Sequence, residues 1–187
     1  MNLLHIDTSI LGDASVSRQL SADIVAKLTT EAPGTSVTYI NLAESPLPHV
    51  TLPQLGTPQA AQVLQQFKSA DVLVIGTPMY NFGIPSQLKA YIDHIAIAGQ
   101  TFKYTAEGPI GLMGGKRVIL ASSTGGIYAE GTPGFALNHQ TEYLKAVFGF
   151  LGIKDIEVIT AQGVAMGDEP KAAAIASAKQ AISQLHA

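Results

Sequence analysis

The chain has no cysteine and little charge, and both absences narrow the classes of protein it can belong to. Without cysteine there is no disulfide framework, no thiol nucleophile and no cysteine metal site. Only 13% of the 187 residues are charged, against about 25% in an average soluble domain. We therefore expect part of the surface to be covered by a second subunit. The net charge of −3 provides no basic field that would attract nucleic acid.

Long apolar runs and the common nucleotide-binding motifs are also missing. No stretch approaches the roughly 18 apolar residues of a membrane span. The first residues lack the basic flank and apolar core of a signal peptide, so we expect a cytoplasmic protein without membrane insertion. There is no G-x-G-x-x-G motif, and Ile110 and Arg117 stand where a Walker A loop needs glycine and a hydroxyl residue. The five histidines show no ligand spacing, so we expect no metal site and expect each histidine to be solvated or to cap a helix.

The sequence does contain a regular alternation of short apolar runs and amphipathic segments. The apolar runs predict five strands, at Leu3–Ile6, Val37–Ile40, Asp71–Gly76, Arg117–Ala121 and Ile156–Thr160. Apolar residues at three- and four-residue spacing predict five helices, at Ser17–Thr30, Pro58–Ser69, Pro85–Ala96, Asn138–Leu151 and Glu169–Leu185. Gly152 follows the fourth of these helices, where a C-cap is expected.

This alternation predicts an α/β fold: a doubly wound, five-stranded parallel sheet with helices on both faces. The flavodoxin-like strand order 2-1-3-4-5 is the economical topology for a single domain that spans residues 1–187. That order places a ligand beyond the carboxyl ends of the strands, so the loops after strands one, three and four should carry the chemistry. Two further segments, Leu42–Thr57 and Ala98–Gly115, are long enough to be functional loops.

The loop after the first strand is rich in serine and enters a helix near Arg18. It contains Ser9, Ser15 and Ser17. Hydroxyls and free amides at a helix N-terminus bind phosphate, because the first-turn N–H groups lack partners and the helix dipole is favourable. Arg18 would add positive charge. Ordinary N-capping by serine is the alternative interpretation.

The loops after the third and fourth strands predict a flat, hydrogen-bonding slot. Tyr80 and Phe82 flank Asn81, whose amide offers donors and an acceptor to the edge of a heterocycle. Gly125 and Gly126 permit close backbone approach to a ligand and, at Gly126, a positive φ. The alternatives are a hydrophobic loop packed on its neighbouring helix and a flexible glycine turn. A phosphate pocket beside a planar aromatic slot matches the shape of FMN.

Four segments carry a family resemblance. They are the serine-rich first loop, PMYNF at Pro78–Phe82 followed by QLKAYID, TFKYTAEGPIGL at Thr101–Leu112, and STGGI at Ser123–Ile127. In these segments the chain resembles the FMN-dependent NADH-azoreductase family, within the flavodoxin-like NAD(P)H:quinone oxidoreductases. The resemblance implies one tightly bound FMN per subunit, contacted by Ser9, Ser15, Val16, Ser17, Met79, Tyr80, Asn81, Phe82, Ser123, Thr124, Gly125 and Gly126. It also implies a homodimer with flavin sites at the interface. Phe102 and Tyr104 would then lie near the substrate pocket, and Tyr104 would reach a neighbour's site.

The resemblance further implies that FMN, rather than any catalytic side chain, carries the chemistry. NADH or NADPH would be the reductant, and quinones and aromatic azo compounds the acceptors. Because one slot would serve both partners, the two-electron hydride transfers should follow ping-pong kinetics. His139 is close enough in sequence to the STGGI segment to be a candidate for a supporting role. The stretch around Leu52–Pro58 is shorter than in some relatives, which bears on pocket shape.

Two other functions remain open at this point. A flavodoxin-type electron carrier would be monomeric and strongly acidic with a compact phosphate loop, whereas this chain is only mildly acidic and has the long Ala98–Gly115 segment. A binding module with the same fold but no flavin is the second alternative. A colourless purified protein that ignores added FMN would favour it.

Overall fold

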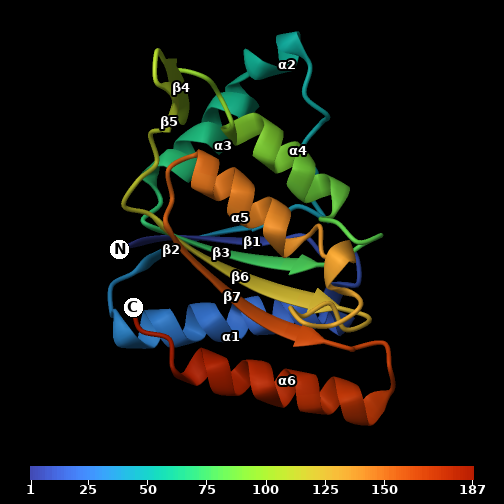
Figure 1. Ribbon diagram of the computed structural model, residues 1–187. Coiled ribbons are helices and arrows are strands. Elements are labelled where there is room, and N and C mark those ends of the chain that lie inside the picture. The colour runs from blue at the N-terminus through green and yellow to red at the C-terminus, as the bar shows by residue number, and fades with distance from the viewer.

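A computed structural model describes residues 1–187, and its central feature is a five-stranded parallel sheet (Figure 1). The strands of the sheet are β1 (Asn2–Asp7), β2 (Ser36–Asn41), β3 (Val72–Pro78), β6 (Arg117–Thr124) and β7 (Asp155–Gln162). They lie in the order β2-β1-β3-β6-β7. This is the predicted order 2-1-3-4-5, because β4 and β5 form a separate two-stranded sheet.

Helices cover both faces of the sheet, as predicted (Figure 1). The helices are α1 (Val16–Glu31), α2 (Leu52–Leu55), α3 (Pro58–Ser69), α4 (Ser86–Ile95), α5 (Thr141–Phe150) and α6 (Asp168–Ser183), with 3-10 turns at Gly12–Ala14 and Phe135–Leu137. Helices α1 and α6 pack on one face, and α3, α4 and α5 on the other. None of the helices combines the length and apolar character needed to cross a bilayer.

The core is divided in two by the sheet, because successive strand side chains point to opposite faces. In β3, Leu73 and Ile75 pack with the α3–α5 layer, whereas Val72 and Val74 pack with α1 and α6. All seven residues of β3 are buried, as expected for a central parallel strand covered on both faces. This buried scaffold fixes the carboxyl ends of the strands, from which the loops of the site extend.

The segment Ala98–Gly115 is a β-hairpin and not an irregular loop. Strand β4 (Phe102–Thr105) pairs antiparallel with β5 (Gly108–Gly111). Gly111 lies so close to Gly152, just past α5, that a Cβ on Gly111 would be 2.1 Å from the Gly152 nitrogen. The hairpin is therefore fixed at the end of α5 opposite the carboxyl ends of the sheet strands (Figure 1).

Two helix ends matter for the site. Helix α1 begins at Val16, with Ser15 as its N-cap. Helix α5 begins at Thr141, three residues later than predicted, because residues 138–140 run across the ends of two strands instead of joining the helix. We call residues 138–140 the strap. At the other end of α5, Gly152 has a φ of 96°, which confirms the predicted C-cap glycine.

Candidate functional site

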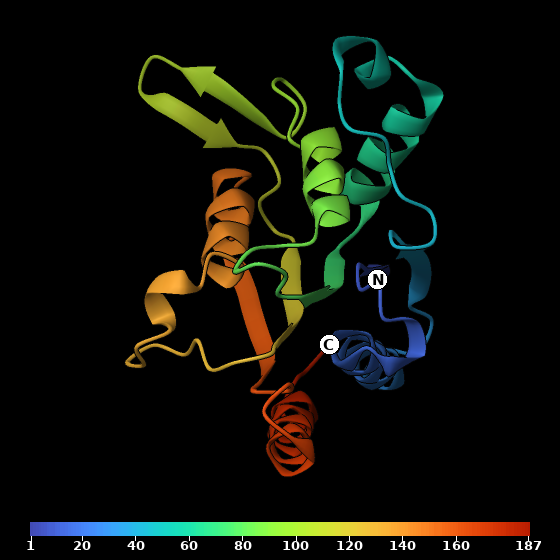
Figure 2. The same cartoon turned by 90° about the vertical axis from the view of Figure 1, so that its right-hand side faces the viewer.

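The three loops predicted to carry the chemistry meet at the carboxyl edge of the sheet. The phenolic oxygen of Tyr80 accepts the Ile10 amide at 3.2 Å and lies 3.4 Å from Ser9 Oγ. The Met79 amide donates to the Ser123 carbonyl at 2.8 Å. The loop after β3 is thus bonded to the loop after β1 and to the end of β6. Figure 2 looks onto this edge, with the loops after β1 and β6 on opposite sides of the loop after β3.

All twelve predicted flavin contacts lie on these loops or at the element ends that border them. They are Ser9, Ser15, Val16, Ser17, Met79, Tyr80, Asn81, Phe82, Ser123, Thr124, Gly125 and Gly126. The structure therefore brings together residues that are up to 117 positions apart, counting from Ser9 to Gly126.

The N-terminus of α1 has the donors that a phosphate group requires. Ser15 Oγ accepts the Arg18 amide at 3.2 Å and lies 3.1 Å from Ser17 Oγ, and both hydroxyls are buried. The amides of Val16 and Ser17 donate to no protein acceptor. Capping by Ser15 is thus compatible with two free first-turn amides at the positive end of a 16-residue helix. These residues fit a phosphate group.

Arg18 faces carboxylates and not the serine hydroxyls. Its guanidinium nitrogens lie 3.8 Å from Asp7 Oδ2, 3.7 Å from Asp13 Oδ1 and 3.5 Å from Glu44 Oε1. The predicted positive charge is therefore largely balanced within the protein. Neutral amides and hydroxyls remain as the donors at the helix N-terminus.

Asp7, at the end of β1, is the centre of a buried polar network that the sequence analysis missed. Its side chain is 1% exposed and accepts the Ser21 hydroxyl at 2.7 Å and the Tyr39 hydroxyl at 3.0 Å. Burial, and then the charge of Asp7, raise the pKa of Tyr39 to about 12. His5 Nε2 lies 3.0 Å from Ser21 Oγ. The expectation that every histidine is solvated or caps a helix was wrong for His5, which is buried within this network.

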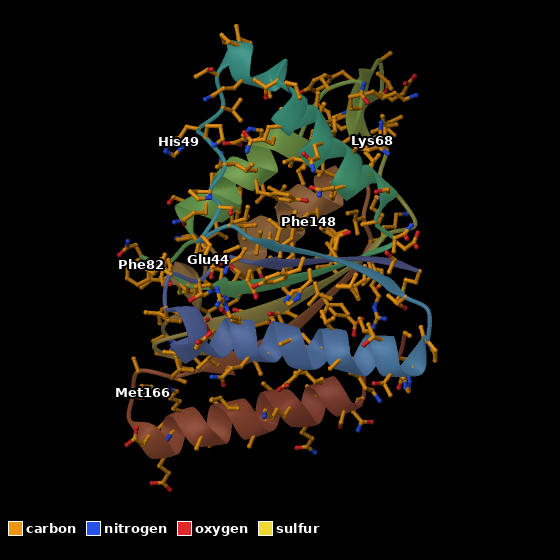
Figure 3. The ribbon with its side chains drawn as sticks, turned by 180° about the vertical axis from the view of Figure 1, so that it is seen from behind. Glu44, His49, Lys68, Phe82, Phe148 and Met166 are labelled. Carbon is orange, nitrogen blue, oxygen red and sulfur yellow. The ribbon has the colours of Figure 1, made fainter.

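The loop after β3 holds Asn81 and Phe82 in a left-handed conformation, with φ values of 49° and 67°. Tyr80 and Gly83 exchange two backbone hydrogen bonds of 3.0 Å around them, the arrangement of a two-residue type I′ turn. Asparagine tolerates a positive φ, but a bulky phenylalanine there is an outlier, at a cost of about 1–3 kcal/mol. The turn exposes both side chains, and Figure 3 shows Phe82 projecting beyond the strand ends.

The loop after β6 is fixed, but not by unusual glycine dihedrals. Neither Gly125 nor Gly126 has a positive φ, so that expectation was wrong at Gly126. The Gly163 amide donates to the Gly126 carbonyl at 3.0 Å. A Cβ on Gly126 would lie 3.4 Å from the Tyr128 ring, which in turn packs edge-on against Phe82 at 6.2 Å between centroids. Tyr128, a residue that no sequence motif singled out, therefore lies beside both Gly126 and Phe82.

The structure does not bring the two predicted pocket residues to the loops of their own chain. Phe102 is only 9% exposed and packs in the core against Phe150, with ring centroids 4.7 Å apart. Tyr104 is 73% exposed on the hairpin, away from the carboxyl edge. His139 has an exposed side chain without a hydrogen bond, and only its backbone amide reaches the site, donating to the Phe82 carbonyl at 3.1 Å.

An open cavity of about 590 Å³ adjoins the loops after β1 and β3. Its lining includes Ile10, Tyr80 and Asn81, together with Lys89 and Asp93 of α4. A volume of this size is within the range of ligand sites, which is about 300–1,000 Å³. Of the twelve predicted flavin contacts only Tyr80 and Asn81 line the cavity, so it extends from the loop after β3 toward α4 and includes neither the α1 N-terminus nor the loop after β6.

A doubly wound parallel sheet with a phosphate-accepting helix N-terminus at its switch point defines a flavodoxin-like protein. The chain belongs to the family with the flavodoxin-like fold, whose profile matches residues 1–185. It is 50% identical over 202 residues to an FMN-dependent NADH:quinone oxidoreductase from Polaromonas naphthalenivorans, covering 98% of this chain and 93% of the relative. It is 51% identical over 197 residues to a protein of the same name from Delftia acidovorans, covering 97% and 93%.

A solved structure extends the comparison. An FMN-dependent NADH-azoreductase from Bacillus anthracis in complex with FMN has a TM-score of 0.85 and 32% identity, covering 98% of this chain and 99% of that one. These findings confirm the resemblance that the loop segments carry.

Proposed function

We propose that this protein is an FMN-dependent NADH:quinone oxidoreductase that also reduces aromatic azo compounds. The observation that carries the proposal is the convergence, at one sheet edge, of two free helix amides with an exposed aromatic turn. Relatives about 50% identical over nearly the whole chain are named for this activity, and a similar structure is an NADH-azoreductase with FMN. We propose NADH or NADPH as the reductant.

In the proposed site, the Val16 and Ser17 amides and the hydroxyls of Ser9, Ser15 and Ser17 would hold the FMN phosphate. Met79–Phe82 and Ser123–Gly126 would hold the ring. The bound cofactor would supply hydride transfer between the reduced nicotinamide and the acceptor. The backbone donors of residues 123–126 would stabilise the negative charge that develops on reduction.

We further propose a homodimer in which the partner's Tyr104 approaches this site. The hairpin lies at the end of the sheet opposite its own loops, so Tyr104 serves a flavin only in another subunit. Large apolar side chains are exposed on the hairpin and at the site, including Tyr104, Ile110, Ile10 and Phe82. Burying them between subunits is favourable. Sedimentation at micromolar concentration should give a dimer, and a monomer would contradict this assembly.

The test of the function is an absorbance spectrum recorded before and after NADH is added without oxygen. An FMN-saturated sample should show flavin bands that NADH bleaches and a quinone restores. Ser17→Asp should weaken FMN binding by at least tenfold, because it sets a carboxylate against the phosphate at the helix N-terminus. Ser17→Ala is the matched control: it removes only the hydroxyl and should weaken binding less. A protein that takes up no FMN would instead be the flavin-free module.

A further inference from the structure

The strap carries one fully buried side chain, the amide of Gln140. Its Nε2 donates to the Thr77 carbonyl at 2.8 Å, and its Oε1 accepts the Ser122 hydroxyl at 2.8 Å. Thr77 and Ser122 are direct neighbours in the β3–β6 ladder. A single planar amide therefore bonds the strap to two central strands. The bonds lie near the carboxyl ends of these strands, just before the loops of the site begin.

The strap also touches the turn that displays Asn81 and Phe82. The amide of His139, next to Gln140, is shared between the Phe82 carbonyl at 3.1 Å and the Leu137 carbonyl at 2.9 Å. The Asn138 side chain accepts the Thr141 amide at 3.3 Å and donates to the Tyr128 carbonyl. One short segment thus connects the turn, the segment that bears Tyr128 and the start of α5.

A phenylalanine in the left-handed region keeps that conformation only when its surroundings fix it. Two ties act on Phe82. The first is local, the pair of backbone bonds between Tyr80 and Gly83. The second comes from the strap, through the His139 amide, and Gln140 is the side chain of the strap that bonds it to the sheet strands.

We propose that Gln140 is a positioning residue for the flavin ring, acting through the strap to keep Phe82 in its left-handed conformation. The inference rests on the proposed flavin site. Only a primary amide offers a donor to Thr77 and an acceptor to Ser122 in one plane. Glutamate keeps the acceptor and loses the donor, and methionine loses both at similar volume. Gln140 influences the ring through the backbone of Phe82, whereas the phosphate end depends on other loops.

The first measurement needs no flavin. In the apoprotein, Gln140→Met should speed hydrogen exchange at the His139 and Gly83 amides relative to wild type. The His139 amide loses its bond to Phe82 directly, and the turn closed by the Gly83 amide opens more often once that second tie is gone. Val63→Ala, a core truncation in α3, is the matched control: it should lower the melting temperature without selective exchange at these two amides. Unchanged exchange in Gln140→Met would overturn the proposal, whether or not the protein binds FMN.

The second measurement uses the FMN-loaded protein. Gln140→Met should lower kcat roughly tenfold, since small misplacements of a reacting ring are costly, while FMN affinity changes less than about threefold because the phosphate contacts remain. The visible circular dichroism of the bound flavin should change as well. Val63→Ala should preserve both kcat and that spectrum. Gln140→Met with a wild-type kcat and spectrum would contradict the proposal.

A double-mutant cycle isolates the path through Phe82. Glycine adopts a positive φ without a steric cost. In Phe82→Gly the turn therefore no longer depends on the hydrogen bond from the His139 amide to keep its conformation. Gln140→Met should then cost much less in the Phe82→Gly background than in wild type. Equal losses in both backgrounds would mean that Gln140 does not act through this turn. Should Gln140→Met fail to fold, Ser122→Ala, which removes one of the two bonds, replaces it in the cycle with the same expected sign.

Discussion

Gly76 in β3 shows how closely α1 approaches the sheet beneath the phosphate-binding end of the site. A Cβ at this position would lie 2.3 Å from Asp7 Oδ1 and 2.9 Å from Ser21 Oγ. The buried carboxylate and its serine donor have no room to move, because they are enclosed by β1, β3 and α1. The position of the α1 N-terminus therefore depends on the absence of a side chain at residue 76.

Gly76→Ala should lower the free energy of unfolding by about 2 kcal/mol or more, as an overpacked core site does. It should also weaken FMN binding, because α1 must shift. Gly149→Ala is the control: it lies in α5 with open space around it and should stabilise the helix by up to about 1 kcal/mol. Urea unfolding measures both changes, and wild-type stability for Gly76→Ala would contradict the packing described.

The raised pKa of Tyr39 predicts a pH dependence of stability. The unfolded tyrosine ionises near pH 10, whereas the folded residue keeps its proton to about 12. The hydrogen bond from Tyr39 to Asp7 therefore contributes its full stabilisation below pH 10 and loses it between pH 10 and 12. The contribution is no more than about 1 kcal/mol, because the side chain is half exposed.

Tyr39→Phe should thus be less stable than wild type at pH 8, and the difference should shrink at pH 11. Unfolding curves at the two pH values measure it. A difference that grows with pH would mean that Tyr39 is not the group responsible.

Individual residues also show where prediction from the sequence succeeds and where it stops. The position of Ser15 and Ser17 at the start of α1 was predictable, because hydroxyl residues are strongly favoured at helix N-termini. The left-handed Phe82 was not, since its conformation is imposed by the strap and opposes its own preference. The buried position of Gln140 could not be predicted from the sequence, because glutamine is usually exposed and its two hydrogen-bond partners are distant in the chain.

At the scale of elements, the five strands and five main helices followed from apolar periodicity, because all of them except the largely exposed edge strand β2 bury apolar side chains in the core. The β4–β5 hairpin escaped prediction. Its strands have four residues each and lie outside the main sheet, and β5 is composed mostly of glycine and proline. Its place in the fold comes from the contact of Gly111 with Gly152, which no local pattern reveals.

That contact gives a prediction about the hairpin. Gly111→Ala places a Cβ against backbone, 2.1 Å from the Gly152 nitrogen, so the hairpin must move off α5. FMN binding should be retained, since the loops of the site are at the other end of the sheet. The dimer should weaken, and quinone turnover should fall with it. Sedimentation measures the dimer and steady-state rates measure the turnover. A stable, fully active dimer in this variant would mean that the hairpin is not part of the proposed interface.

At the scale of the whole molecule, the proposed function has the donor and the acceptor share one slot at the carboxyl edge of the sheet in turn. Initial rates against NADH at several quinone concentrations should therefore give parallel double-reciprocal lines, the signature of ping-pong turnover. Intersecting lines would mean that both partners bind together, and a second binding surface would then be needed. The same experiment with NADPH compares the two reductants.

The distance between the hairpin and the loops of the same chain has a genetic consequence. Consider coexpression of two impaired alleles, one carrying Ser17→Asp and the other Tyr104→Ser. In a mixed dimer of the proposed kind, one site would inherit both lesions, and the other would combine intact loops with an intact hairpin. Half of the sites in such a heterodimer would regain full function, so two alleles that are each impaired alone would complement one another within a single protein.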